Sequence, residues 1–300
     1  MKKNIFFLWL FLNSLYAFCQ YIPGGNRPIN NGNIRFGQDS QNSINTSGNL
    51  LQPFYYSDLV LDWRQLTYEE PGPPKVPYPL DSKFGVGGDG TSNWNTNGTL
   101  APNPIMANQV FDPSGFNITG IINVKGDITV GTAQLEVINS YSIGLGDNFV
   151  KITTTAKNIG AAAITNLRYW VGTKDDYVGG TDSPTIVRGN LVGASFQQLA
   201  LITQRSSALR ISTADEGILF FTTSIRGNNS HAGYNNVSNP SEGLDPDTAL
   251  ISNTIDGSYS MYVRMNDLAV GESDSFTWYY AAAALDELDD VIGDVADASC

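Results

Sequence analysis

Between residues 116 and 282 the chain alternates short apolar runs with turn signals at near-regular intervals. The runs are rich in β-branched and aromatic residues, and Gly, Asn and Asp separate them. No helical period falls between the runs, so the pattern predicts an all-β fold, an antiparallel β-sandwich, with a large super-sandwich as one form of it. The predicted strands are 118–124, 127–130, 135–143, 149–155, 166–173, 208–213, 218–224, 259–265 and 273–282.

The last apolar pattern of the chain has a helical period instead. Residues at spacings of three and four form one apolar stripe, and Asp and Glu occupy the other face. The stripe consists of Leu285, Leu288, Val291, Ile292 and Val295. We therefore predict one short C-terminal helix over 284–296. Because isolated helices below about 12–15 residues barely form in water, we expect this helix to dock on the sandwich.

The first nineteen residues have the pattern of a cleaved secretory signal. Two lysines are followed by an apolar run over 5–12, and Ala17 and Cys19 are small residues at the two positions that a signal peptidase reads. The run is shorter than the roughly 20 residues that span a bilayer. We predict a signal peptide over 1–19 and an exported protein that is secreted, periplasmic or at the cell surface, with no integral membrane span.

Composition divides the rest of the chain. Residues 20–50 are rich in Asn, Gly, Gln and Ser and contain few apolar side chains, so we predict a flexible N-terminal arm. Residues 51–300 are predicted to form a single β-sandwich domain whose first strand is 59–63. Residues 227–247 are again polar and Gly-rich, and we predict a long loop there.

The net charge bears on the class of binding partner, and the cysteine content bears on what stabilises the fold. The formal net charge is −12, and loss of Lys2 and Lys3 with the signal makes it −14. This acidity argues against nucleic acid, because phosphate binding requires clustered Lys and Arg. Cleavage after Cys19 would leave Cys300 as the one cysteine, so we expect stability to come from burial and not from disulfides.

Motifs for catalysis are incomplete. Residues 85–90 (GVGGDG) match GxGxxG, but the flanking sequence predicts neither the strand nor the helix that a dinucleotide site needs. The one histidine, His231, lies in an Asn/Gly/Ser-rich segment with no nucleophile motif nearby, and we interpret it as a surface residue. We assign no catalytic residue and favour a non-enzymatic protein.

Aromatic and acidic residues are the candidates for ligand binding. Trp94 lies in a polar loop, and the strand that contains Tyr169 and Trp170 leads directly into Asp175 and Asp176. Exposed rings stack on sugar faces, and the alternative is that the rings fill the core. These five residues form the predicted ligand-binding set, with a glycan or another surface protein as the expected partner.

The acids after that strand allow two further hypotheses. Asp175, Asp176 and Asp182 could supply oxygens to calcium, which takes several oxygen ligands; the alternative is that they are solvated loop acids. A carbohydrate-active enzyme would instead use two such carboxylates beside Tyr169 and Trp170. This enzyme is the alternative to a binding module.

Three segments carry a resemblance to a known kind of protein. Residues 166–179 (NLRYWVGTKDDYVG), 188–190 (RGN) and 276–282 (FTWYYAA) resemble a module of secreted surface proteins of Bacteroidetes, substrates of the gliding-associated secretion system. The resemblance covers about residues 135–300. It implies a surface β-sandwich and supplies neither a ligand nor catalytic residues. The expected function is an exported binding, adhesion or structural module.

Overall fold

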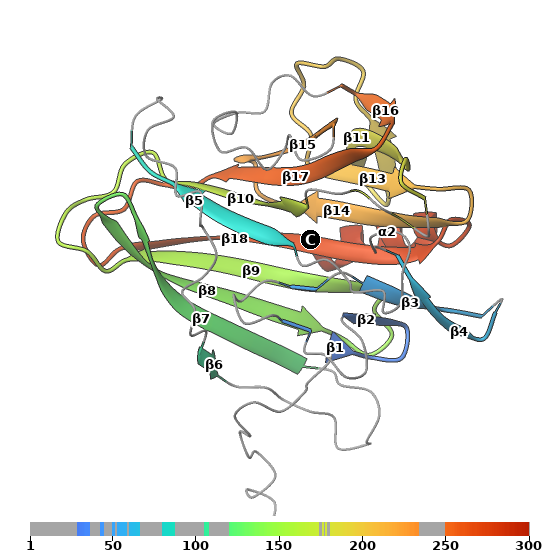
Figure 1. Ribbon diagram of the computed structural model, residues 1–300, viewed down its shortest axis with the longest axis horizontal. Coiled ribbons are helices and arrows are strands. Elements are labelled where there is room, and N and C mark those ends of the chain that lie inside the picture. Colours follow the sequence, from blue (N-terminus) through green and yellow to red (C-terminus); the bar gives the residue numbers. More distant parts are fainter. Residues whose placement is uncertain are drawn as a thin grey trace, which may run out of the picture.

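The computed structural model confirms the predicted fold class, an all-β antiparallel sandwich with a C-terminal helix (Figure 1). It describes residues 29–36, 43–44, 50–51, 53–58, 60–66, 80–87, 105–107, 120–173, 176, 178, 181–233 and 250–299. In this part of the chain no helix is long and apolar enough to cross a bilayer.

A large antiparallel sheet of ten strands forms the main layer of the described fold. Its order is β12-β11-β13-β14-β18-β9-β8-β7-β6, and β16 pairs with β11 on the same edge as β12. The strands are β6 (Ile105–Ala107), β7 (Gly120–Val130), β8 (Ala133–Ile143), β9 (Phe149–Asn158), β11 (Thr185–Val192), β12 (Ser195–Gln198), β13 (Ala208–Ser212), β14 (Glu216–Thr222), β16 (Ser252–Thr254) and β18 (Ser273–Ala284).

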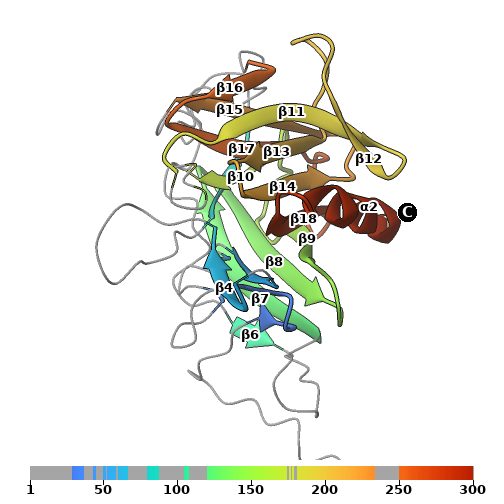
Figure 2. The same ribbon diagram turned by 90° about the vertical axis from the view of Figure 1, so that its right-hand side faces the viewer.

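Two smaller antiparallel sheets cover one face of the main sheet, and a helix packs on the other face (Figure 2). One small sheet has the order β15-β17-β10-β5 and the other β1-β2-β3-β4. Their strands are β1 (Ile29–Asn30), β2 (Ile34–Phe36), β3 (Pro53–Ser57), β4 (Asp62–Gln65), β5 (Asp81–Gly85), β10 (Arg168–Thr173), β15 (Gly227–Gly233) and β17 (Gly257–Arg264). The helix is α2 (Leu288–Ser299).

Burial along each strand follows from how many of its faces are covered. From Leu135 on, β8 alternates buried and half-buried positions, because a strand of period two that packs on one side buries every second residue. Every residue of β14 is buried instead. Its Phe220 points into the core shared by the three sheets, and its Leu219 packs against α2 on the opposite face.

The helix confirms the predicted apolar stripe from Leu288 on and begins later than predicted, so Leu285 precedes it and is only partly buried. Leu288, Val291, Ile292 and Val295 are buried against the main sheet. The predicted start at 284 is wrong, because Ala284 still pairs with Glu216 as the last residue of β18. Because β18 continues to Ala284, the helix begins only after the turn that follows this strand.

Two predicted strands are one. The pattern suggested a turn between 124 and 127, but β7 runs through these residues, and Gly126 pairs with Val137 of β8 in unbroken register. The predicted first strand at 59–63 is correct only for Asp62 and Trp63, which begin β4. Val60 and Leu61 lie in the turn of the β3–β4 hairpin, where Leu61 is 73% exposed and has a φ of 53°.

The predicted flexible arm is wrong for residues 29–36, which form β1 and β2. Ile34 and Phe36 are completely buried in the core that joins the three sheets. Few apolar residues are present in this stretch, and the fold buries them through pairing with β3. Most of the remaining positions between 20 and 50 lie outside the described residues.

One buried amide fastens this N-terminal segment to the main sheet. The Asn31 side chain is 2% exposed, and its Nδ2 donates to the carbonyl oxygens of Gly144 at 2.8 Å and of Asp147 at 2.7 Å. Its Oδ1 accepts from the backbone N–H groups of Asn33 and Ile34, each at 3.0 Å. The β1–β2 turn is thereby joined to the β8–β9 turn.

Asn31→Ala is expected to lower the free energy of unfolding by about 2 kcal/mol, because it leaves buried backbone groups without partners. Asn33→Ala is the matched control. The Asn33 side chain is exposed and donates to the Gly146 carbonyl oxygen at 2.9 Å, so its loss should cost less than about 0.5 kcal/mol. Urea denaturation measures both variants, and equal midpoints would contradict the proposed fastening role.

Candidate functional site

The predicted aromatic binding residues are core residues. Tyr169 is 1% exposed and packs on Phe84 and Phe276, with ring centroids 4.9 and 5.2 Å away. Trp170 is 2% exposed and meets the Tyr262 ring edge-on at 6.4 Å. Both faces of β10 are covered, so neither ring offers a surface to a sugar. The prediction of an exposed platform at Tyr169 and Trp170 is therefore wrong.

The predicted acidic loop is not a single solvated cluster. Asp176 is fully buried, whereas Asp182 is exposed. Asp175 and Trp94 lie outside the described residues. Within the described part of the chain, no three Asp, Glu, His or Cys side chains gather closely enough to hold one metal ion. Calcium binding by Asp175, Asp176 and Asp182 stays a prediction.

His231 is not the surface residue that its polar neighbours suggested. It belongs to β15, which occupies the start of the predicted loop, pairs with Tyr259 of β17 and is 3% exposed. Burial lowers the pKa of His231 to about 4, the backbone of Leu250 opposes this shift through a hydrogen bond, and nearby Arg188 adds to it. The imidazole is neutral at pH 7.

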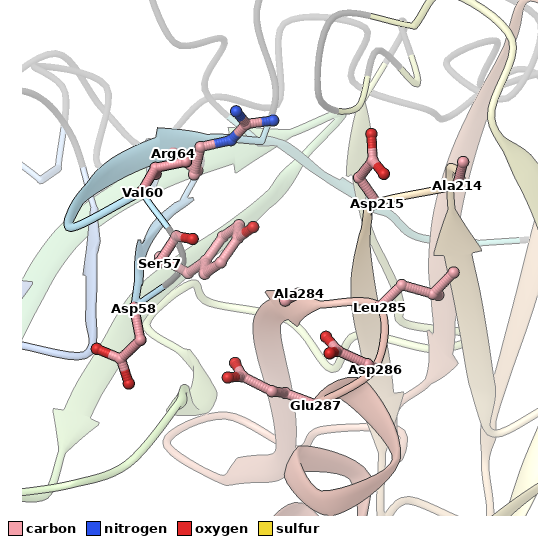
Figure 3. A pocket seen from close by; sticks show the side chains of 11 residues that line it. Ser57, Asp58, Val60, Arg64, Ala214, Asp215, Ala284, Leu285, Asp286 and Glu287 are labelled. Atoms are coloured by element: carbon pink, nitrogen blue, oxygen red, sulfur yellow. The ribbon is translucent and has the colours of Figure 1, made fainter.

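A cleft of about 660 Å³ lies where three segments meet, and sequence reasoning did not find it (Figure 3). The segments are the β3–β4 hairpin, the β13–β14 turn, and the end of β18 with the turn that leads into α2. The lining residues are Tyr55, Ser57, Asp58, Val60, Arg64, Ala214, Asp215, Ala284, Leu285, Asp286 and Glu287. The β3–β4 hairpin is separated from the other segments by about half of the chain.

An ion pair beside the cleft joins its lining residue Arg64 to the buried Glu216. Arg64 Nε of the hairpin donates to Glu216 Oε1 of β14 at 2.9 Å, and its Nη2 donates to the same oxygen. The Glu216 side chain is 1% exposed and that of Arg64 is 40% exposed. Burial raises the pKa of the Glu216 carboxyl despite the opposing effect of Arg64. The hydrogen bond to Glu216 raises the pKa of Arg64, so the guanidinium is charged.

Tyr55 supplies an aromatic ring and a hydroxyl to the same cleft. It is 4% exposed, and burial, reinforced by the charge of Glu216, raises its pKa to about 12. The phenol is therefore neutral at pH 7. A neutral phenol can both donate and accept a hydrogen bond, and the Tyr55 side chain is hydrogen-bonded to that of Ser57.

Four exposed carboxylates complete the lining, namely those of Asp58, Asp215, Asp286 and Glu287. Figure 3 shows the side chains of Asp58 and Glu287 facing one another from the hairpin and from the start of α2. Burial first, and then the charges of Asp286, Asp58 and Asp290, raise the pKa of Glu287. The carboxylate of the hairpin residue Asp58 therefore acts on the protonation of Glu287, which belongs to a different element.

The dipole of α2 explains the presence of only two of these four acidic residues. Asp286 and Glu287 lie beside the N-terminus of α2, where unpaired N–H groups favour negative charge. Asp58 and Asp215 belong to turns elsewhere in the fold, so the helix dipole gives no reason for them. In the sequence, Asp286 and Glu287 read as part of the solvent face of a helix. No local signal links them to Asp58 or Asp215.

Comparison with known proteins identifies the fold and no family. No family model matches the sequence, and no curated protein resembles it significantly. A bacterial glucoamylase complexed with acarbose is similar in structure, with a TM-score of 0.55 and 7% identity over 91% of this chain and 34% of the glucoamylase chain. A galactose mutarotase-like protein from Lactobacillus casei matches with a TM-score of 0.44 and 7% identity, over 86% of this chain and 100% of its own.

The present chain thus spans about a third of the length of the glucoamylase that it resembles. At 7% identity this likeness concerns the fold alone. No catalytic or binding residue is transferred from it to the cleft.

Proposed function

We propose that this protein is an exported carbohydrate-binding module and that the cleft is its binding site. The observation that carries the proposal is the cleft itself, about 660 Å³ in volume, with polar groups converging from three segments. Small-ligand sites are typically concave, about 300–1,000 Å³ in volume, and orient their ligand with a few placed polar groups. Export rests on the signal-like pattern of residues 1–19.

The chemistry of the lining suits a polyhydroxylated ligand. Carboxylates accept charge-assisted hydrogen bonds from hydroxyl groups, and these bonds are stronger than those between neutral partners. Asp58, Asp215, Asp286 and Glu287 supply such acceptors, and Tyr55 adds an apolar ring with a polar end. The similarity in fold to part of a glucoamylase solved with acarbose is consistent with a sugar ligand and supports it only at the level of fold.

A glycan array on residues 20–300 tests the proposal, with isothermal titration calorimetry on each glycan that binds. Asp215→Asn is expected to weaken binding about tenfold, because one charge-assisted hydrogen bond contributes about 1.5–3 kcal/mol. Asp256→Asn is the matched control: Asp256 is exposed in the β16–β17 turn and does not line the cleft. Absence of any glycan ligand, or equal affinity of both variants, would overturn the proposal.

A carbohydrate-active enzyme is the second candidate function, now placed at the cleft and not beside Tyr169 and Trp170. The observation that favours it is that the Asp58 and Glu287 side chains face one another (Figure 3), since glycoside hydrolysis uses a pair of carboxyl groups, and the raised pKa of Glu287 is in the direction that a general acid needs. Incubation of a bound glycan with the protein, followed by an assay for new reducing ends, separates the two functions. Hydrolysis that is lost in Glu287→Gln, with binding retained, would establish the enzyme.

A further inference from the structure

We infer that the protein forms a twofold-symmetric dimer in which β12 of one copy pairs with β12 of a second copy. The pairing joins the two main sheets into one, and it uses a surface that is separate from the cleft. Strand β12 is the last strand at one end of the main sheet and lies beside α2 (Figure 2). Three features of this edge point to a second copy: its unpaired backbone groups, its lack of charge and the apolar side chains around it.

The backbone of β12 is unpaired on its outer side. β12 pairs with β11, and among the described residues no other strand pairs with it. The Leu199 N–H, directly after β12, donates to the Arg188 carbonyl oxygen of β11 at 3.0 Å. Because successive residues of an antiparallel strand point their backbone groups to opposite sides, those of Phe196 and Gln198 point outward. Such an edge is a template for pairing with another strand.

The edge carries none of the charges with which proteins commonly block edge pairing. Residues 189–204 contain no Asp, Glu, Lys or Arg, although 15% of the chain is charged. The exposed residues of β12 are Ser195, Gln197 and Gln198. A protein with a formal net charge of −12 repels its own copies, and this repulsion is weakest where two uncharged edges meet. A strongly charged partner would find no opposite charge here.

Pairing with itself gives β12 a matched partner. If Gln197 lies on the twofold axis, Phe196 of one copy lies opposite Gln198 of the second, and their outward N–H and C=O groups bond across the interface. The two Gln197 side chains then face one another. An amide contains donors and an acceptor, so it can bond to a second amide. A charged side chain at this position would instead face a like charge.

Apolar side chains extend the interface beyond the paired strand. Val192 lies at the end of β11, and Leu201 and Ile202 follow β12; all three are exposed. The Ile202 carbonyl oxygen accepts from Arg188 Nη1 at 3.3 Å, which holds this segment beside the edge. Burial of these side chains between two copies favours association. Because the paired strand is short and the interface therefore small, the dimer is expected to be weak and to depend on protein concentration.

Sedimentation velocity over a range of protein concentrations tests the dimer. The wild type is expected to shift from monomer to dimer as the concentration rises. Gln197→Glu should raise the dissociation constant about fivefold or more, because it replaces an amide–amide hydrogen bond by two carboxylates that face one another. Gln134→Glu is the matched control, because Gln134 is an exposed strand residue of β8, in the other half of the main sheet, and should leave the dissociation constant unchanged.

Gln198→Pro provides a second variant. It removes an N–H group that points away from β11, so the ladder within one copy keeps its hydrogen bonds while the dimer loses two, one from each copy. Its dissociation constant should also rise about fivefold or more. Circular dichroism and the urea midpoint would confirm that both variants remain folded.

The salt dependence is an independent readout. The acidic helix α2 packs beside β12, and the twofold axis is perpendicular to the joined sheet, so the two helices lie on the same face and repel one another. Sodium chloride screens this repulsion and is expected to strengthen the dimer. A dimer that salt weakens, or that Gln197→Glu and Gln198→Pro leave intact, would overturn the inference. A monomer at every concentration would overturn it too, and would leave the edge to a strand of another protein.

Discussion

Leu288→Asp is expected to lower the free energy of unfolding by about 4 kcal/mol, within the range of roughly 2–5 kcal/mol for losing a buried leucine and burying a charge. Leu288 is completely buried at the first residue of α2. It fills a socket that Gly217 of β14 leaves open: a Cβ on Gly217 would lie 2.5 Å from Leu288 Cδ2. A carboxylate in this socket would have no aqueous contact.

The position of Leu288 offers only a small compensation. An acid in the first turn of a helix typically gains about 0.3–1 kcal/mol from the helix dipole, and at most about 2 kcal/mol, which is below the loss from burial. Urea denaturation measures the effect, with Asp297→Ala as the control, since Asp297 is exposed on the same helix. An unchanged midpoint for Leu288→Asp would mean that α2 does not belong to the cooperative core.

Acidification from pH 7 to pH 4 is expected to remove about 3 kcal/mol of stability through His231 alone. Its pKa is about 4 in the folded protein against an ordinary histidine value of 6.5, mainly because burial disfavours the charged imidazolium. Each unit of difference corresponds to about 1.4 kcal/mol. Below pH 6.5 the unfolded chain takes up a proton that the folded chain does not, so stability is full above pH 6.5 and falls as the pH drops toward 4.

The chain contains one histidine, which makes this contribution separable from the carboxylates. The free energy of unfolding would be measured against pH for the wild type and for His231→Gln, and the difference between the two slopes isolates the imidazole. An NMR titration of the His231 ring in the folded protein gives its pKa directly. A value near 6.5 would contradict the buried neutral imidazole, whatever the overall stability curve shows.

Several elements followed from local pattern. The β-branched runs at 135–143 and 149–155 became β8 and β9, since a period of two over a half-covered strand is visible in the residues themselves. The apolar stripe from Leu288 to Val295 likewise identified the docked face of α2. The fold class is therefore recoverable from periodicity. Export of the chain stays a prediction from residues 1–19.

Other elements lacked such a signal. β11 was not predicted although Thr, Ile, Val and Leu make up most of it, and β12, β15 and β16 were not predicted because Gly, Asn, Ser and Gln dominate them. Their strand conformation comes from neighbours, such as β17 for β15, more than from their own residues. Polar composition at 29–36 similarly suggested an arm, whereas pairing with β3 and the Asn31 contacts hold that segment on the sheet.

By itself the sequence determined which of the predicted segments form strands and which one forms a helix, because that choice depends on the spacing of apolar residues within a few positions. Only the tertiary structure decided which strands are covered on both faces. Tyr169, Trp170 and His231 lie on such strands, so they are buried and not available to a ligand at the surface. It also decided the site: β14 pairs with β18, and β3 packs against β18 from a separate sheet, which brings Asp58, Asp215 and Glu287 to one cleft. The period of apolar residues identifies one buried face of a strand or helix. Contacts between residues far apart in the sequence determine whether the opposite face is also buried.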